Sequence, residues 1–275
     1  MVGTLRRAGV DVVVFNRTAA RAEETAAATG AEMAPTAAAA VSDADVVISS
    51  LADDGAVSEV YLGAEGAAAG LKSGAVVLEM STIDPQTLTM IEPAISEAGA
   101  TLLDAPVSGS VQLVEAGNLT VMVGGDADAL AVAEPVLSAL AARIFHVGPL
   151  GAGATIKLAV NAIVHAINIS VSEALVLAEK AGVDRSTAYE VFAASAAGAP
   201  FVAYKRAAFE NPDEAPVAFS LDLVAKDLDL ILSLAEDVGV EMGQGAANRA
   251  VTGKAIDAGY GQSDMSAVAG YLRNG

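Results

Sequence analysis

Lys157 and Asn161 stand out in a segment that is otherwise nearly all apolar. The lysine can hold or transfer a proton, and the asparagine can donate and accept hydrogen bonds. Residues four apart in a helix share one face, so a helix here presents an ammonium group beside a carboxamide. Both groups are costly to bury without polar partners. Gly151 and Gly153 precede the pair and let another molecule approach the backbone closely. A lysine that reaches solvent from a core helix, next to a solvated asparagine, would give the same pattern.

A second polar segment, D-A-P-V-S-G-S at residues 104–110, follows a predicted strand. Ligands of open α/β sheets bind at the carboxyl ends of the strands. Ser108, Gly109 and Ser110 offer hydroxyl groups and accessible amides that suit a carboxylate. A simple turn would also explain these residues. Thr82 follows another predicted strand, where a helix cap ahead of Pro85 is the alternative.

Asn16, Arg17 and Thr18 end a predicted strand near the start of the chain. In a doubly wound dinucleotide fold this position meets the adenosine ribose, where an acidic residue binds the 2′-hydroxyl and an arginine accommodates a 2′-phosphate. The Arg-Thr pair therefore favours NADP, although NAD stays possible. A turn followed by a threonine cap is the alternative, and it is compatible with the cofactor role.

The composition excludes several classes of function. The chain has 275 residues with 34 acidic and 15 basic side chains, which gives a formal charge of −19. A partner such as nucleic acid or an anionic membrane needs a basic face, so neither is expected. The chain lacks cysteine and has two histidines, which argues against a thiol nucleophile or a metal site. His165 is expected to serve helix packing or a subunit contact. We expect a soluble cytoplasmic protein without a signal peptide.

The first half alternates short β-branched runs with helical stretches, which is typical of a largely parallel, doubly wound sheet. Strands are predicted at Val10–Phe15, Asp45–Ser50, Ala75–Glu79, Thr101–Asp104, Leu119–Val123 and Ile144–Val147. Helices are predicted at Ala19–Thr29, Pro85–Ala98 and Ala127–Ala141.

Beyond Gly153 the pattern predicts helices alone. They are expected at Thr155–Lys180, Asp184–Ala194, Ser220–Val238, Gly243–Ala258 and Asp264–Arg273. We therefore predict an α/β protein with a Rossmann-like NADP-binding domain at residues 1–150 and an all-helical substrate and dimerisation domain at residues 151–275. The first long helix is apolar on most of its circumference, so we expect it to be shared between subunits or to pack against the first domain. We favour an obligate homodimer or higher homo-oligomer.

The opening of the chain lacks the expected glycine loop. In a doubly wound dinucleotide fold the first strand is followed by G-x-G-x-x-G and a helix that holds the pyrophosphate. Residues 1–9 instead read as the back half of that helix, with Gly9 as its C-cap. We therefore expect the sheet to lack its first strand, through a mis-assigned start or a real loss.

Four ordered motifs together make the chain resemble the β-hydroxyacid dehydrogenase family, which includes 3-hydroxyisobutyrate dehydrogenase, tartronate semialdehyde reductase and glyoxylate/succinic semialdehyde reductases. The resemblance extends from Met1 to about Arg273. The motifs are N-R-T at residues 16–18, D-A-P-V-S-G at 104–109, G-A-G-A-T-I-K-L-A-V-N at 151–161 and K-D-L at 226–228.

The resemblance implies an NADP(H)-dependent oxidoreductase that interconverts a small β-hydroxy acid and its semialdehyde. It implies that Lys157 is the catalytic acid/base and that Asn161 helps to hold the substrate. Ser108 and Gly109 would bind the substrate carboxylate, and Ser110 stands where many members have glycine. The substrate and the physiological direction stay open.

The same matching assigns cofactor contacts to Asn16, Arg17 and Thr18, to Thr82 beside the nicotinamide, and to Lys226 from the helical domain. Two other functions stay open. One is a catalytically silent, dimeric binding or scaffold protein. The other is an imine reductase on the same fold, although members of that group usually carry another residue in place of Lys157.

Overall fold

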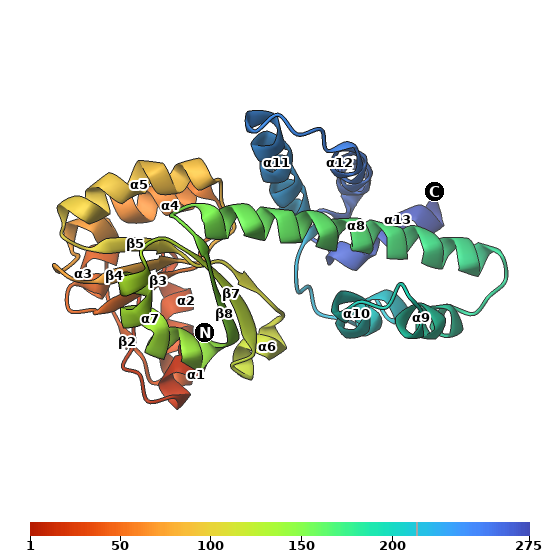
Figure 1. Cartoon of the computed structure of the whole chain (residues 1–275). Coiled ribbons are helices and arrows are strands. Elements are labelled where there is room, and N and C mark those ends of the chain that lie inside the picture. The colour runs from red at the N-terminus through yellow and green to blue at the C-terminus, as the bar shows by residue number, and fades with distance from the viewer. Residues whose placement is uncertain (213) are drawn as a thin grey trace. The chain divides into compact units, whose positions relative to one another are not determined.

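The computed structural model describes residues 1–212 and 214–275 and consists of two compact units (Figure 1). The units are Met1–Lys157 and Leu158–Gly275. Helix α8 (Ala152–Lys180) begins in the first unit and continues into the second. The expected boundary between residues 150 and 151 stays a prediction.

A six-stranded sheet forms the centre of the first unit. Its strands pair in the order β3-β4-β5-β7, and both β6 and β8 pair with β7. The strands are β3 (Val46–Ser49), β4 (Val76–Glu79), β5 (Thr101–Asp104), β6 (Val107–Ser108), β7 (Leu119–Gly124) and β8 (Ala141–Gly148). The first three are parallel, whereas β7 is antiparallel to β5. The segment between β5 and β7 holds only β6 and the five-residue α6 (Val111–Glu115), and a parallel connection needs a longer crossover.

Helices cover both faces of this sheet, which confirms the predicted doubly wound α/β architecture. Val77 of β4 packs into one apolar core, while Val76 and Leu78 pack into the other, as alternation along a strand requires. Residues of α3 (Ala37–Val41), α4 (Asp54–Leu62) and α5 (Pro85–Glu97) join the first core. Residues of α1 (Val2–Arg7) and α7 (Ala127–Leu140) join the second.

The strand pairing is interrupted between β1 and β3. Strand β1 (Val13–Val14) pairs only with β2 (Glu32–Met33) among the described residues, and α2 (Ala19–Thr29) connects them. The sequence predicted a strand at Val10–Phe15. Strand β1 is shorter because its partner β2 pairs with it at only two residues. In the doubly wound order the first strand lies between these two strands, and this is where the pairing stops.

The second unit is helical, as predicted, and its core draws on every long helix it contains. Its further helices are α9 (Arg185–Ala194), α10 (Pro200–Glu210), α11 (Leu221–Asp237), α12 (Gly243–Ala255) and α13 (Val268–Asn274). The sequence analysis missed α10, because the preceding Gly-Ala-Pro resembles a loop. Proline is nevertheless favourable in the first turn of a helix. The buried side chains of Phe201 and Phe209 anchor α10 in the core of the second unit.

Helix α8 is the one helix in the described part of the chain that is long and apolar enough to cross a membrane, judged by length and composition. Leu158, Ile169 and Leu175 of this helix are buried in the core of the second unit. Packing within the protein therefore accounts for much of its apolar character.

Asp104 fixes the N-terminal end of α8 to the sheet. Its carboxylate, only 1% exposed, accepts hydrogen bonds from the Gly151 N–H at 2.8 Å and the Ala154 N–H at 2.7 Å. The first amides of a helix lack partners within the helix, and its dipole favours an anion there. Burial raises the pKa of Asp104, and these amides partly oppose that rise. A Cβ atom on Gly153 would meet the carboxylate at 2.8 Å, so glycine permits this close approach.

We predict that Asp104→Asn lowers the free energy of unfolding by about 1–3 kcal/mol, because an NH2 group replaces one of the two acceptor oxygens and leaves a buried N–H unpaired. Urea unfolding measures this loss. The matched control is Asp126→Asn, at the start of α7, where Asp126 accepts only from the Ala129 N–H at 2.8 Å. Asparagine caps a helix as well as aspartate, so the control should change stability by less than about 0.5 kcal/mol. Equal losses in the two variants would contradict the double-acceptor role.

Candidate active site

Arg17 is exposed at the end of β1, as cofactor binding requires. The side-chain oxygen Oδ1 of Asn16 accepts from the Thr18 N–H at 2.9 Å and shapes the turn. The Arg17 side chain is 78% exposed, and its ion pair with Glu59 at 3.4 Å is long and solvated. Thr18 occupies the N-cap position of α2, but its hydroxyl makes no capping bond. An exposed guanidinium in this place fits a phosphate on the adenosine ribose.

A buried polar network lies at the ends of β3 and β4, directly before Thr82. Glu79 is 1% exposed and accepts from the Ser49 hydroxyl and, at 2.8 Å, from the Ser81 N–H. The Ser49 hydroxyl also lies 2.7 Å from the Tyr61 hydroxyl. Burial raises the pKa of Glu79 and, with the nearby Glu79 carboxyl, raises that of Tyr61. Thr82 itself is half-buried, and its contact with a nicotinamide stays a prediction.

Ser108 belongs to β6, where it pairs with Thr120 of β7. Gly109 has a φ of 148°, and a Cβ atom there would meet a methyl group of Leu119 at 2.8 Å. The conformation and the crowding together require glycine. The Ser110 hydroxyl accepts from the Leu113 N–H at 3.4 Å and caps α6. Ser110 therefore has a structural role beside the substrate contact that we predicted for it.

Lys157 lies on the second turn of α8, close behind the amides that Asp104 holds. It is half-buried and belongs to the first unit. Asp104 is the last residue of β5, so the start of α8 lies at the carboxyl ends of the parallel strands. This is the edge at which doubly wound sheets bind their ligands.

Asn161, one turn further along α8, is 8% exposed and meets a carboxylate of α11. Its amide nitrogen donates to the Asp227 carboxylate at 2.6 Å. The ammonium of Lys226 lies 2.9 Å from the other oxygen of Asp227, and the Lys226 side chain is 23% exposed. Asp227 itself is fully buried. The K-D-L motif thus holds the Asn161 amide, whereas a cofactor contact of Lys226 stays a prediction.

His165 faces the same carboxylate. Its ring is 2% exposed, and Nε2 lies 3.5 Å from the Asp227 oxygen that Asn161 also reaches. Burial raises the pKa of Asp227, but the His165 ring and the Lys226 ammonium bring it below its usual range. The carboxylate is therefore ionised at neutral pH. The packing role that we expected for His165 omitted this polar contact.

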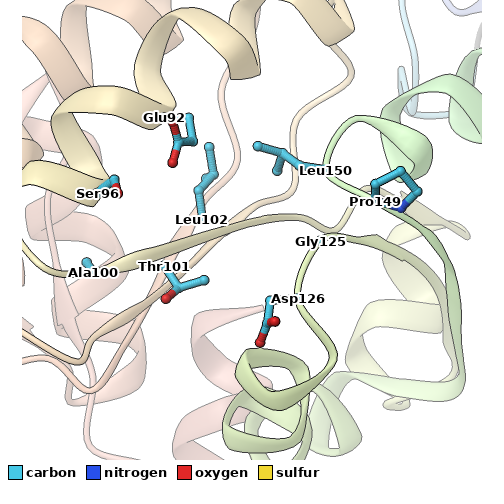
Figure 2. A pocket seen from close by; sticks show the side chains of 9 residues that line it. All are labelled: Glu92, Ser96, Ala100, Thr101, Leu102, Gly125, Asp126, Pro149 and Leu150. Carbon is cyan, nitrogen blue, oxygen red and sulfur yellow. The ribbon is translucent and has the colours of Figure 1, made fainter.

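Figure 2 shows a pocket of about 380 Å³ in the first unit that contains none of the predicted site residues. It lies between α5, the start of β5 and the turns before α7 and α8. The carboxylates of Glu92 and Asp126 line it, which disfavours an anionic substrate there. The described residues include no group of three histidine, aspartate or glutamate side chains that could hold a metal ion.

Sequence reasoning missed the three buried carboxylates Glu79, Asp104 and Asp227 as organising residues. Glu79 and Asp104 each stand between two apolar, buried residues, and Asp227 is followed by the buried Leu228. That context is a usable signal, because a charged residue is rarely sealed in a core without partners. The sequence did not reveal Ser49, Ala154 and Asn161 as their partners, because these residues lie 30 to 66 positions away.

We predict that Glu79→Gln makes the protein relatively more stable as the pH rises. The raised pKa means that folded Glu79 holds its proton above the ordinary pKa of 4.5, so wild-type stability falls as the pH rises through the raised value. Glutamine cannot ionise, so the variant does not lose this stability as the pH rises. Melting temperatures from about pH 4 to about pH 8 test the difference, with the exposed Glu97→Gln of α5 as the control. Parallel curves for wild type and Glu79→Gln would refute the prediction.

Comparison with known proteins places both halves of the chain. Residues 1–148 match the NAD-binding domain of 6-phosphogluconate dehydrogenase. Residues 151–272 match the NAD-binding domain of NADP-dependent 3-hydroxyisobutyrate dehydrogenase. These matches confirm the predicted NAD(P) cofactor class.

Individual relatives agree along the whole length. The NAD-dependent L-serine dehydrogenase of Pseudomonas aeruginosa is 35% identical over 98% of this chain and 92% of that protein. The chloroplastic glyoxylate/succinic semialdehyde reductase 2 of Arabidopsis thaliana is 32% identical over 98% of this chain and 74% of that protein. The crystal structure of 3-hydroxyisobutyrate dehydrogenase from Salmonella typhimurium has a TM-score of 0.89 and 27% identity, and it covers 98% of this chain and 95% of its own. The chain belongs to the β-hydroxyacid dehydrogenase family of NAD(P)-dependent oxidoreductases.

Proposed function

We propose that this protein interconverts a small β-hydroxy acid and its semialdehyde with NADP(H), and that Lys157 is the general acid/base. The observation that carries the proposal is the placement of Lys157. It follows the helix turn that Asp104 fixes at the carboxyl ends of the parallel strands. A half-buried ammonium at this edge stands where a doubly wound sheet receives its ligands.

In this proposal one carbon separates the carboxylate of the substrate from the reacting carbon. The Ser108 hydroxyl and the Gly109 amide are the donors that we assign to it, with Ser110 beside them. A chain with a charge of −19 offers few cations for an anionic ligand, so neutral donors are suited to this task. The relatives named for L-serine and for glyoxylate and succinic semialdehyde support this substrate class.

Proton transfer by Lys157 completes the chemistry. The nicotinamide cofactor, when bound, supplies or accepts the hydride. In the reductive direction the Lys157 ammonium hydrogen-bonds the substrate carbonyl oxygen and gives it a proton as negative charge develops there. In the oxidative direction neutral Lys157 takes the hydroxyl proton. The Asn161 amide orients the reacting oxygen or the lysine.

The preference for NADP over NAD rests on Arg17. Asn16, Arg17 and Thr18 lack a carboxylate that would bind a free ribose 2′-hydroxyl. The guanidinium is exposed and can exchange its long contact with Glu59 for a phosphate. Thr82 and Lys226 are the further cofactor contacts that we propose.

The decisive assay is NADPH oxidation with a panel of small semialdehydes, with NADH in parallel. Turnover should be faster with NADPH, and Lys157→Met should lower kcat by about 10²–10⁴-fold, the usual contribution of a general acid. Lys72→Met is the control, because Lys72 pairs with Asp45 on the surface, away from these residues, and should retain activity.

Two outcomes would overturn the assignment. If wild type turns over semialdehydes and Lys157→Met does so equally well, another group transfers the proton. If wild type shows neither turnover nor a rise in melting temperature with NADPH, a silent scaffold fits better. Reduction of a cyclic imine in the same assay, without turnover of semialdehydes, would favour an imine reductase.

We also propose that the protein is a cytoplasmic homodimer that buries the exposed side of α8. Ile163 and Leu177 on this helix are 63% and 72% exposed, and they lie fourteen residues apart on one face. Ile163→Glu should therefore convert the dimer to a monomer in light scattering after gel filtration. Val238→Glu, at an equally exposed position beyond α11, should leave the dimer intact. A monomeric wild type would exclude this interface.

A further inference from the structure

We infer that His165 is a positioning residue that holds the Asp227 carboxylate, so that Asn161 presents its carbonyl oxygen, and not its NH2 group, to the substrate. The inference deepens the proposed function, on which the role of Asn161 in substrate binding rests. It assigns a task to a buried histidine that the proton-transfer step leaves unused. It also specifies which hydrogen-bonding group of the substrate Asn161 can bind.

The orientation of the Asn161 amide follows from its neighbour. An ionised carboxylate can only accept hydrogen bonds, so the amide must turn its NH2 group towards Asp227. The 2.6 Å contact is between the Asn161 nitrogen and a carboxylate oxygen. The carbonyl oxygen of Asn161 is then the atom left for other partners. It can accept from a substrate hydroxyl or from an ammonium, but it cannot donate to a substrate carbonyl.

The buried carboxylate needs further donors to stay in place. Asp227 is fully buried, and an isolated charge in such a position is very costly. The ammonium of Lys226, whose side chain is partly exposed, forms an ion pair with one Asp227 oxygen at 2.9 Å. The other oxygen has Asn161 at 2.6 Å and His165 at 3.5 Å. Without either neighbour, the attraction of the Lys226 ammonium would draw the carboxylate towards its own side.

His165 is placed to act on Asp227 and on little else. It lies four residues beyond Asn161 on α8, so both side chains leave the same face of the helix. Its ring packs against Phe219 with 6.2 Å between the centroids and an angle of 25° between the planes. Neither ring nitrogen has a hydrogen-bond partner within normal distance among the described residues. Asn168, the next buried polar residue of α8, instead donates to the Met265 carbonyl oxygen at 2.9 Å.

A ring nitrogen that faces a carboxylate must carry a proton, so the structure requires Nε2–H in His165. Nitrogen NMR of the wild-type protein shows directly which ring nitrogen of His165 carries the proton. The His165 signals are assigned by their absence from the spectrum of His165→Gln. A protonated Nε2 at about pH 7.5, lost in Asp227→Asn in favour of Nδ1–H, supports the contact. An Nε2 without a proton in the wild-type protein overturns the proposal, whatever the activity.

Kinetics in both directions test the consequence for the substrate. His165→Leu should raise the KM of the hydroxy acid by about tenfold, the equivalent of one lost hydrogen bond. The KM of the semialdehyde should change by less than about threefold, because its carbonyl cannot donate to Asn161. A mutation leaves the equilibrium constant of the reaction unchanged, so kcat/KM must fall by the same factor in both directions. In the reductive direction this fall should therefore appear in kcat. His165→Gln keeps an N–H donor and should restore most of the KM.

The matched control is His146→Gln, because His146 is the other histidine of the chain. It lies on β8, where its Nε2 is 2.8 Å from the Gly125 carbonyl oxygen. It should leave both KM values unchanged. Equal changes of KM in the two directions, or no rescue by glutamine, would show that His165 only fills space and would overturn the proposal. If wild type has no turnover at all, the proposed function fails, while the imidazole spectrum still decides the contact with Asp227.

Discussion

A carboxylate sealed from water must be surrounded by N–H donors, and this requirement organises the first unit of the protein. Asp104 ends the strand β5 and meets the first amides of α8, whose helix dipole favours an anion at that place. Gly153 is glycine because any side chain would occupy the space of the carboxylate. The position of Lys157 on the second turn of α8 then follows from helix geometry.

The second unit repeats this logic with different donors. Asp227 is surrounded by an amide, an ammonium and an imidazole, which come from two helices. Replacement of such a group by an apolar residue of similar size is often neutral for stability. We therefore interpret the retained charge as a means of orienting Asn161. An ionised carboxylate only accepts hydrogen bonds, so the Asn161 amide must turn its NH2 group towards it.

The sequence was sufficient for the regular part of the fold. Short apolar runs of two or three residues marked β3, β4 and β5 closely, since strands that helices cover on both faces need little else. It was insufficient for β1 and β6, two-residue strands whose extent depends on their partners. Lys157 and Asn161 could be found because they interrupt an apolar helix. The bond between Asn161 and Asp227 could not, because 66 residues separate them and only the tertiary structure brings them together.

The two polar groups of α8 complement each other when the amide orientation is considered. Lys157 as an ammonium is only a donor, and the outward oxygen of Asn161 is only an acceptor. In the proposed reaction, the substrate oxygen is either a carbonyl that accepts from the lysine or a hydroxyl that donates to the asparagine. The two side chains would then suit both forms of the substrate, because the lysine carries the transferred proton in one form and the substrate carries it in the other. An amide turned the other way would offer two donors and would favour the carbonyl form alone.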